Sequence, residues 1–260
     1  TTLEGLMGPN GELSDIQQAF IDETADALEG LPLPDDTVHL TGFMKENMQA
    51  RDRSSRILAA LSAAFGGIFT CNANKTETTV GYGTLYGDLA GAFAATADLW
   101  KYQIYDLGRK LNAWYGRAVI PEGIFTVMPS AELSENQDVT QGKGDPLIYE
   151  YHDYLFRSFI EPWQRQTPEV ILKAYAKGNL EDLIGCSIIV SNIFPTAKDF
   201  IEDLEKWWNL FSGFAVAKRI QTPPLLAVSR RPYGYDLRES QLRPYYTDAY
   251  LSLKEKLLAD

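Results

Sequence analysis

The chain has 260 residues, of which 45% are hydrophobic, 23% charged and 12% aromatic, as is usual for a protein that buries a core. These proportions exclude a mainly disordered chain, and there is no apolar run of about eighteen residues that would cross a membrane. The net charge of -11 repels a phosphate backbone and argues against general nucleic-acid binding.

Only two cysteines are present, Cys71 and Cys186, which excludes a disulfide framework. The first ten residues hold no basic region followed by an apolar block, so nothing resembles a secretory signal. We therefore expect a reduced, cytoplasmic protein. Cys186 lies in an apolar run, which is typical of a buried core thiol.

Charge is distributed unevenly along the chain. Residues 1–44 hold nine acidic residues and no Lys or Arg, whereas residues 217–243 hold six basic and two acidic residues. The basic stretch is suited to an anionic small molecule. The alternative is a solvated or inter-subunit surface, and charge alone does not decide between them.

The first predicted helix covers residues 14–30, where Ser14 and Gln17 form a capping box and Gly30 follows the apolar stripe. A second helix is predicted over residues 46–65, ending at Gly66-Gly67. Its buried stripe is expected to consist of Ile57, Leu58, Leu61 and Phe65.

Beyond these glycines, residues 68–71 predict a short buried strand that leads into a polar loop. Asp98 is expected to cap a helix with Trp100, Ile104, Leu107 and Leu111 on one stripe. Thr167-Pro168 and Gly178 frame a further helix, and residues 133–145 predict a loop or a mobile lid. Aromatic residues expected in core and interface follow: Tyr149, Tyr151, Tyr154, Phe156, Phe159, Trp163, Phe200, Trp207, Trp208, Phe211 and Phe214.

General motifs for catalysis are absent. Residues 81–86 place a tyrosine where a dinucleotide fingerprint requires its third glycine, and residues 142–144 lack the rest of a Walker loop. His39 and His152 have no metal-binding partner at the usual spacing, which argues against zinc. What remains is a series of polar blocks at the ends of predicted elements, where α/β proteins bind their ligands.

In order, these blocks read NMQAR (47–51), NANKTE (72–77), GYGTLYGD (81–88), Lys101, PSAEL (129–133) and Lys218-Arg219. Together they resemble the synthetase domain of glutamine-dependent NAD+ synthetase, an amide ligase of the ATP-pyrophosphatase type. The resemblance runs from about residue 46 to residue 221. It implies an α/β fold of the adenine-nucleotide alpha hydrolase-like (Rossmann-like) kind, with a parallel sheet, rich in helices and incomplete at the N-terminus.

On this basis we divide the chain into an acidic helical segment (1–45), a nucleotide-binding core (46–137) and a C-terminal part (138–260) with a lid loop, aromatic helices and a basic tail. The resemblance implies two steps: the carboxylate of deamido-NAD+ attacks the α-phosphate of ATP, and ammonia then displaces AMP. It also implies Mg2+ as cofactor, ammonia from a glutaminase domain, and a homo-oligomer. No nucleic acid or membrane is expected as partner.

Carried over by position, the resemblance places Glu77 on the Mg2+ ligand, Lys101 on the catalytic lysine that binds the ATP phosphates, and Ser130 on a hydroxyl that contacts ATP. Asn72 falls on a further ATP contact, where the family more often has Thr or Ser. Arg51 and Lys218 fall on residues that bind deamido-NAD+. Asp88 is interpreted as structural.

Each role has a plainer alternative. Glu77 and Arg51 are also suited to a structural ion pair, Lys101 to a solvated helix surface, and Ser130 to a helix cap before Glu132.

One departure from the family is large. Its Ser-Gly-Gly-x-Asp-Ser pyrophosphate loop is missing from these 260 residues, as is the glutaminase domain. We therefore expect a C-terminal portion of a longer polypeptide, or a subunit whose first strands come from elsewhere. A non-catalytic nucleotide-binding or subunit-interaction module is the alternative, and a ligase with another acceptor is a third possibility that the NMQAR and NANKTE blocks disfavour.

Overall fold

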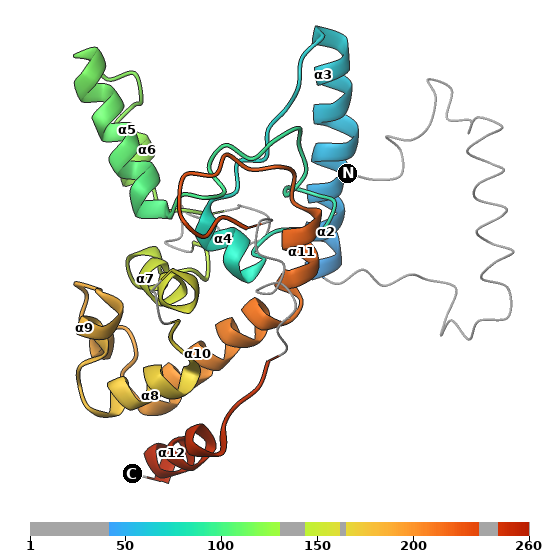
Figure 1. Cartoon of the computed structure of the whole chain (residues 1–260). Helices are drawn as coiled ribbons and strands as arrows, with labels where there is room; N and C mark the ends of the chain where they lie inside the picture. Colours follow the sequence, from blue (N-terminus) through green and yellow to red (C-terminus); the bar gives the residue numbers. More distant parts are fainter. Residues whose placement is uncertain (1–41, 131–143, 162–164, 234–243, 260) are drawn as a thin grey trace, which may run out of the picture. The chain divides into compact units, whose positions relative to one another are not determined.

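The computed structural model describes residues 42–130, 144–161, 165–233 and 244–259, all within the compact unit Gly42–Asp260. The predicted helix 14–30, most of the predicted loop 133–145, Trp163 and His39 lie outside the described residues. Helices dominate what is described (Figure 1). They are α2 (Gly42–Arg51), η2 (Asp52–Leu58), α3 (Ala59–Phe65), α4 (Lys75–Val80), α5 (Lys101–Tyr115), α6 (Gly123–Thr126), α7 (Tyr149–Ile160), α8 (Pro168–Ala176), α9 (Leu180–Ile184), η5 (Val190–Asn192), α10 (Ala197–Ser212), α11 (Ala215–Gln221) and α12 (Asp248–Ala259).

The second predicted helix is confirmed, and it begins at Gly42, earlier than expected, as the continuous series α2, η2 and α3. It ends at Gly66, whose φ of 62° places it in the left-handed region that glycine adopts at low cost. Its middle part, η2, is a π-helix, a wider winding that often occurs at functional sites.

The predicted buried stripe of this helix is wrong for three of its four members. Ile57, Leu61 and Phe65 are 47%, 49% and 85% exposed, whereas Ala50 and Ser54 are buried. Leu58 is half-buried and lines a cavity. The reason is that the backbone near Gly87 lies close to this helix at Ala50. A Cβ added to Gly87 would lie only 3.2 Å from the Ala50 carbonyl carbon, so the helix packs here through small residues. Within the described residues, the larger apolar side chains Ile57, Leu61 and Phe65 are not buried.

Three short extended segments lie side by side in parallel. Cys71 pairs with Ala94, and Ala94 pairs with Leu225. The Cys71 N–H donates to Phe93 O at 3.0 Å, and the Leu226 N–H donates to Ala94 O at 3.1 Å. The predicted strand 68–71 therefore contributes a single bridge, and a segment more than 120 residues away in the sequence joins the same pairing.

α5 lies where it was predicted, but Asp98 does not cap it. The residue before α5 is Trp100, whose N–H donates to Gln103 Oε1 at 3.0 Å. Asp98 is buried and binds Lys75 Nζ at 2.9 Å. The prediction failed because a buried ammonium requires a buried carboxylate, and sequence spacing does not reveal that pairing.

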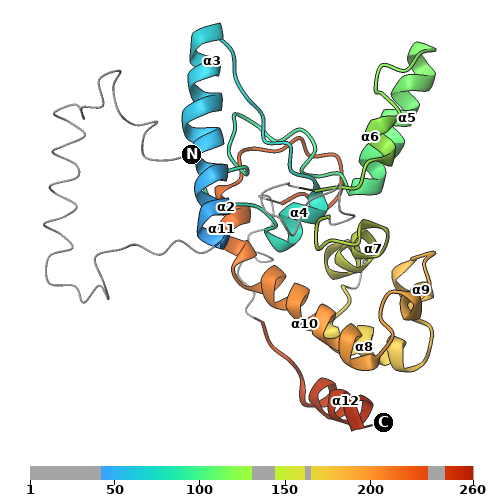
Figure 2. The same ribbon diagram turned by 180° about the vertical axis from the view of Figure 1, so that it is seen from behind.

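The core lies around α7, α8 and α10, as the aromatic pattern predicted. In both views α10 runs beside α8 and α12 (Figure 1 and Figure 2). Among the described residues, Phe214 differs from this pattern, since it is 60% exposed. The core aromatics include Trp100, Tyr151, Phe156, Phe159, Phe200, Trp207 and Phe211.

The predicted boundaries of α8 are confirmed. Thr167 is its N-cap, Pro168 is its first residue, and Gly178 follows its end with a φ of 68°.

The predicted core thiol Cys186 is buried and free, Cys71 is also buried and free, and His152 is buried as well. His152 Nδ1 accepts the Ile148 N–H at 2.8 Å, and Nε2 faces Asp203 Oδ2 at 3.1 Å. Because both ring nitrogens are engaged inside the core, this pair serves packing and is not suited to act as a general base. Among the described residues, no helix has both the length and the apolar character that a bilayer span requires.

Asp153 joins three helices. Its Oδ1 accepts a short hydrogen bond from the Thr76 hydroxyl of α4, and its Oδ2 accepts the Tyr102 N–H of α5 at 2.9 Å. The carboxyl is 1% exposed, and burial raises its pKa to about 6, although both hydrogen bonds act to lower it.

This shift predicts an unusual dependence of stability on pH. A carboxyl whose pKa is higher in the folded state than in the unfolded state favours folding when protonated, so its contribution declines as pH rises from about 4 to about 6. Asp153→Asn keeps an acceptor for the Tyr102 N–H and carries no charge. Its free energy of unfolding is expected to rise relative to wild type by on the order of 3 kcal/mol across that range. Urea unfolding at pH 4, 5, 6 and 7 measures this, and parallel curves would contradict it.

Candidate functional site

A cavity of about 740 Å3 lies between η2, the start of α4 and the α5–α6 pair. Four predicted site residues line it: Asn72, Glu77, Lys101 and Ser130. α5, α6 and the residues after α6 supply an apolar wall that includes Ile104, Tyr105, Ile124, Phe125, Val127 and Met128. The sequence therefore brings acidic, basic and hydroxyl groups to one apolar-walled space, which is the usual form of a small-molecule site.

Glu77 owes its position to the first turn of α4. Asn74 is the N-cap: its side chain accepts the Glu77 N–H at 2.9 Å, and Glu77 Oε2 accepts the Asn74 N–H at 2.8 Å. This reciprocal capping box satisfies two backbone donors at the helix start. It also fixes the carboxylate in one orientation at the cavity.

The Tyr149 hydroxyl lies between the second carboxylate oxygen of Glu77 and the carboxylate of Asp145. The Tyr149 hydroxyl lies 3.1 Å from Glu77 Oε1 and 3.1 Å from Asp145 Oδ2. A hydroxyl has one hydrogen, so it donates to only one of these carboxylates at a time. Burial raises the pKa of Glu77 to about 7, against the Asn74 N–H and the charge of Lys101.

Lys101 is the first residue of α5. Its ammonium lies 5.1 Å from the centre of the Tyr149 ring and 5.4 Å from that of Tyr105. It is half-buried and faces aromatic rings, so the solvated-surface alternative describes it poorly. The same cation is close enough to lower the pKa of Glu77.

Asn72 and Ser130 lie at other parts of the lining. Asn72 Oδ1 accepts the Thr70 hydroxyl at 2.8 Å, which turns its amide NH2 group away from Thr70. Ser130 is half-buried in the cavity wall. Glu132, which the helix-cap alternative requires, lies outside the described residues.

Arg51 and Lys218 are not in this lining, and both bind the loop of residues 81–88. Arg51 Nε donates to Leu85 O at 3.1 Å, and Lys218 Nζ donates to Gly81 O at 2.7 Å. Burial lowers the pKa of Lys218, opposed by the charge of Asp88. Among the described residues, no ion pair joins Arg51 to Glu77, so that alternative is wrong.

The same loop contains Asp88, whose Oδ1 accepts the Thr84 N–H at 2.5 Å, as its structural interpretation expects. The arginine that does line the cavity is Arg53, two residues beyond Arg51. Arg53 and Ser54 both belong to the π-helix η2, and both line the cavity.

The donor set at Glu77 fits Mg2+. In the ranges that the structure describes, no three His, Cys, Asp or Glu side chains form a ready-made metal cage. Mg2+ does not need one, because it binds through one or two carboxylates together with substrate phosphates and water. Glu77 and Asp145 are two hard oxygen donors at one cavity, and burial raises the pKa of Glu77 although the charge of Lys101 acts to lower it.

The comparison with protein families decides the affiliation, since the family model described as NAD synthase matches residues 12–184. This chain belongs to the NAD synthase family. Its members are ligases, and the curated relatives carry the name glutamine-dependent NAD(+) synthetase.

The relative from Thermotoga maritima is 44% identical over 117 residues, which are 45% of this chain and 20% of that protein. The relative from Xanthomonas campestris is 32% identical over 194 residues, 75% of this chain and 30% of that protein. This NAD synthase chain therefore spans less than a third of the length of these relatives.

A glutamine-dependent NAD(+) synthetase from Cytophaga hutchinsonii has a similar structure, with a TM-score of 0.53 and 18% identity. The match covers 95% of this chain and 35% of that one. At this identity the likeness shows the fold alone, which is the adenine-nucleotide alpha hydrolase-like fold of NAD synthetases.

Three residues of this NAD synthase site were missed from the sequence: Tyr82, Asp145 and Tyr149. Tyr82 donates to Asp145 Oδ1 at 2.9 Å, which completes a chain of groups from Tyr82 to Glu77. Asp145 was read as the end of a polar loop, and Tyr149 as one of many core aromatics. For Asp145 and Tyr149 the only available signal was their position just before α7 and at its first residue.

Proposed function

We propose that this chain forms part of the site at which NAD+ is made from deamido-NAD+ and ATP. The observation that carries the proposal is the presence of Glu77 and Lys101, one carboxylate and one ammonium, at the same apolar-walled cavity. A carboxylate substrate must approach a triphosphate, and both are anions. A site for this reaction therefore needs cations that offset their repulsion.

In the first step a nicotinate carboxylate oxygen bonds to the α-phosphorus of ATP, and the bond to pyrophosphate breaks. The product is an acyl adenylate. In the second step the nitrogen of ammonia bonds to the acyl carbon, AMP leaves, and ammonia loses one proton. Both steps depend on positioning and on neutralising charge more than on proton transfer by the protein.

Lys101 would bind phosphate oxygens and offset the charge of the leaving pyrophosphate. Asn72 and Ser130 would direct an amide and a hydroxyl toward ATP. Glu77, with Asp145 beside it, would hold Mg2+, which would offset the negative charge of the phosphates. The apolar wall from α5 and α6 limits water, which would otherwise hydrolyse the adenylate.

Arg51 and Lys218 were expected to bind deamido-NAD+, and we propose that they act on it indirectly, by holding the loop of residues 81–88. Both bind the backbone of this loop from elements far apart in the sequence. We propose that the loop presents the dinucleotide to the cavity, and that these two cations set its shape. Arg53 at the cavity lining is a further candidate for the dinucleotide.

Four further inferences belong to this proposal. The names of the relatives support ammonia derived from glutamine by a glutaminase domain. The exposed Ile57, Leu61 and Phe65 support a homo-oligomer, because large apolar side chains in a row favour an interface. The bridges at Cys71, Ala94 and Leu225 support a parallel sheet with further strands. A cytoplasmic location is proposed as well.

ATP–pyrophosphate exchange tests the adenylation step alone, because it requires neither glutaminase nor ammonia. The natural full-length protein is expected to exchange labelled pyrophosphate into ATP only when deamido-NAD+ and Mg2+ are both present. Binding of ATP without any exchange would instead support the non-catalytic module. Exchange driven by a different carboxylate, such as aspartate, would indicate another acceptor.

A further inference from the structure

α4 has six residues, and nearly all of them are buried. Its side chains bind different anchors: Lys75 binds Asp98, Thr76 binds Asp153, and Thr79 accepts from Tyr233. Glu77 faces the cavity. Because so short a helix has little stability of its own, its orientation is set by these anchors.

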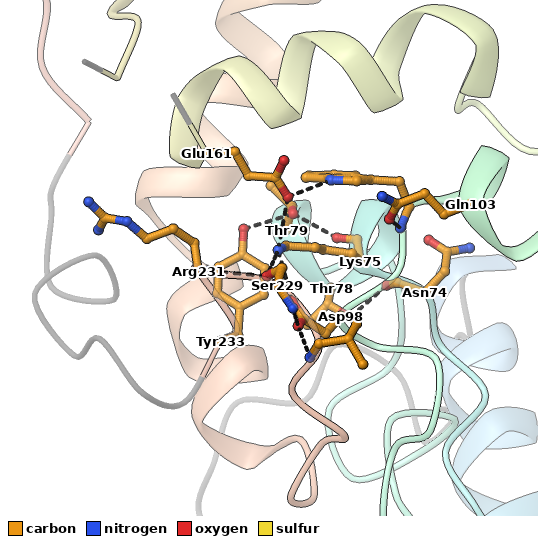
Figure 3. A network of polar contacts seen from close by, with 12 residues as sticks. Asn74, Lys75, Thr78, Thr79, Asp98, Gln103, Glu161, Ser229, Arg231 and Tyr233 are labelled. Atoms are coloured by element: carbon orange, nitrogen blue, oxygen red, sulfur yellow. Dashed lines mark hydrogen bonds and ion pairs between the residues drawn. The ribbon is translucent and has the colours of Figure 1, made fainter. Parts of the chain in front are cut away.

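The strongest anchor is the network around Lys75 (Figure 3). The Lys75 ammonium is 0% exposed and donates to Asp98 Oδ1 at 2.9 Å, to Ser229 Oγ at 2.9 Å and to Glu161 Oε1 at 3.2 Å. All three donors of the ammonium are therefore used. Trp100 Nε1 donates to the same Glu161 oxygen at 2.7 Å.

The segment of residues 228–233 completes this network, although Ser229 is 154 positions from Lys75 in the sequence. Ser229 Oγ donates to Asp98 Oδ1 at 2.7 Å, and the Val228 and Ser229 N–H groups donate to Asp98 Oδ2 at 2.7 and 2.6 Å. Ser229 Oγ also accepts the Arg231 N–H at 3.2 Å. Tyr233 donates to Thr79 Oγ1 at 2.7 Å, at the other end of α4 (Figure 3).

Ser229 connects these parts because it binds both members of the buried ion pair. Lys75 is the first residue of α4, and Glu77 is the third. A shift of the Lys75 ammonium would turn the first helical turn, and with it the Glu77 carboxylate and its cap at Asn74. Reacting groups tolerate little displacement, since an error of about 1 Å costs as much as about 100-fold in rate.

We propose that Ser229 is a positioning residue for the metal-binding carboxylate: the segment of residues 228–233 locks Lys75 and so holds Glu77 where the Mg2+–ATP complex requires it. This inference rests on the proposed function. It adds a residue that lies outside the cavity lining, from a segment beyond the residues matched by the family model.

Ser229→Ala in the full-length protein tests the proposal, with Ser158→Ala as the matched control. Ser158 is a buried serine on α7, 3% exposed, and its hydroxyl donates to Leu155 O on its own helix. Ser229→Ala is expected to weaken Mg2+ binding in the presence of ATP about tenfold, measured by titration calorimetry, because groups that hold a metal ligand in place typically contribute this much. Ser158→Ala is expected to change only the melting temperature.

The exchange assay gives the second measurement. Ser229→Ala is expected to raise the Mg2+ concentration for half-maximal exchange by the same factor, with partial recovery of rate at high Mg2+. A purely structural role would lower the amount of active protein and leave the Mg2+ dependence unchanged, so an unchanged Mg2+ dissociation constant overturns the proposal.

Two further outcomes are informative. If Ser229→Ala fails to fold, Tyr233→Phe removes the Thr79 hydrogen bond from the same segment and is expected to shift Mg2+ binding in the same direction by a smaller factor. No shift in that variant also overturns the proposal. A wild-type protein without exchange contradicts the proposed function and this inference together, whereas an active wild type with an unaltered Ser229→Ala contradicts the positioning role alone.

Discussion

Glu77→Gln is expected to abolish Mg2+-dependent adenylation while the protein stays folded. The substitution keeps the size of the side chain and an oxygen that can accept the Asn74 N–H, so the capping box of α4 survives. It removes the negative charge that Mg2+ requires. We expect the rate of ATP–pyrophosphate exchange to fall by about 1000-fold or more, the order of effect found when a group that stabilises transition-state charge is removed.

Folding is expected to improve slightly in this variant, because a buried carboxylate with a raised pKa costs free energy when it ionises. The melting temperature without Mg2+ should therefore equal or exceed that of the wild type. Mg2+ should raise the melting temperature of the ATP-bound wild type and leave that of Glu77→Gln unchanged.

Glu150→Gln serves as the control, since Glu150 is an exposed carboxylate on α7 outside the cavity lining. It removes the same charge close by and is expected to keep exchange within about twofold, because exposed charges are screened by solvent. Equal losses in the two variants would show a general effect of charge. An unchanged rate in Glu77→Gln would refute the metal role of Glu77.

Local sequence rules predicted the helices well where the signal lies within a few residues. Thr167, Pro168 and Gly178 delimit α8 by capping chemistry, and α8 lies where they indicate. The stripe at Ile57, Leu61 and Phe65 also predicted a helix correctly, but its burial was wrong. Periodicity states which residues share a face, and says nothing of whether the rest of this chain covers that face.

The candidate site shows the same contrast between features with a local sequence signal and features that depend on long-range packing. Glu77 and Lys101 were identified through a resemblance of motifs, and the structure brings them to one cavity. Asp145 and Tyr149 were missed because their link to Glu77 spans about 70 residues and depends on how α4 and α7 pack. Asp98 was assigned to a cap for the same reason, since its partners Lys75 and Ser229 are distant in the sequence.

Lys75→Met is expected to cause the largest loss of stability, about 3–5 kcal/mol in the free energy of unfolding, because it leaves the Asp98 charge buried without its partner. Hydrogen bonds from Lys75, Val228 and Ser229 hold the pKa of Asp98 below its usual value, although burial acts to raise it. Urea unfolding followed by tryptophan fluorescence measures the loss, and Trp100 lies within the network as a local reporter.

The sign of the pH dependence provides a second check on Lys75→Met. A carboxylate with a lowered pKa stabilises the fold above its unfolded pKa and loses this contribution as pH falls through the folded value. The deficit of Lys75→Met relative to wild type should therefore be largest near neutral pH and shrink in acid, where Asp98 is protonated. Asp98→Asn in the Lys75→Met background should recover part of the loss at pH 7, since an amide carries no charge to leave unpaired.

Lys173→Met is the matched control for Lys75→Met, because Lys173 also pairs with a carboxylate, Glu169, but its side chain is 49% exposed. An exposed pair of this kind is screened by solvent and contributes little to stability, so the control should differ little from wild type. A loss in Lys75→Met no greater than in Lys173→Met would mean that Asp98 is already neutral in the fold. The network would then consist of ordinary hydrogen bonds, and the anchor that we assign to α4 would rest on Thr76 and Asp153 instead.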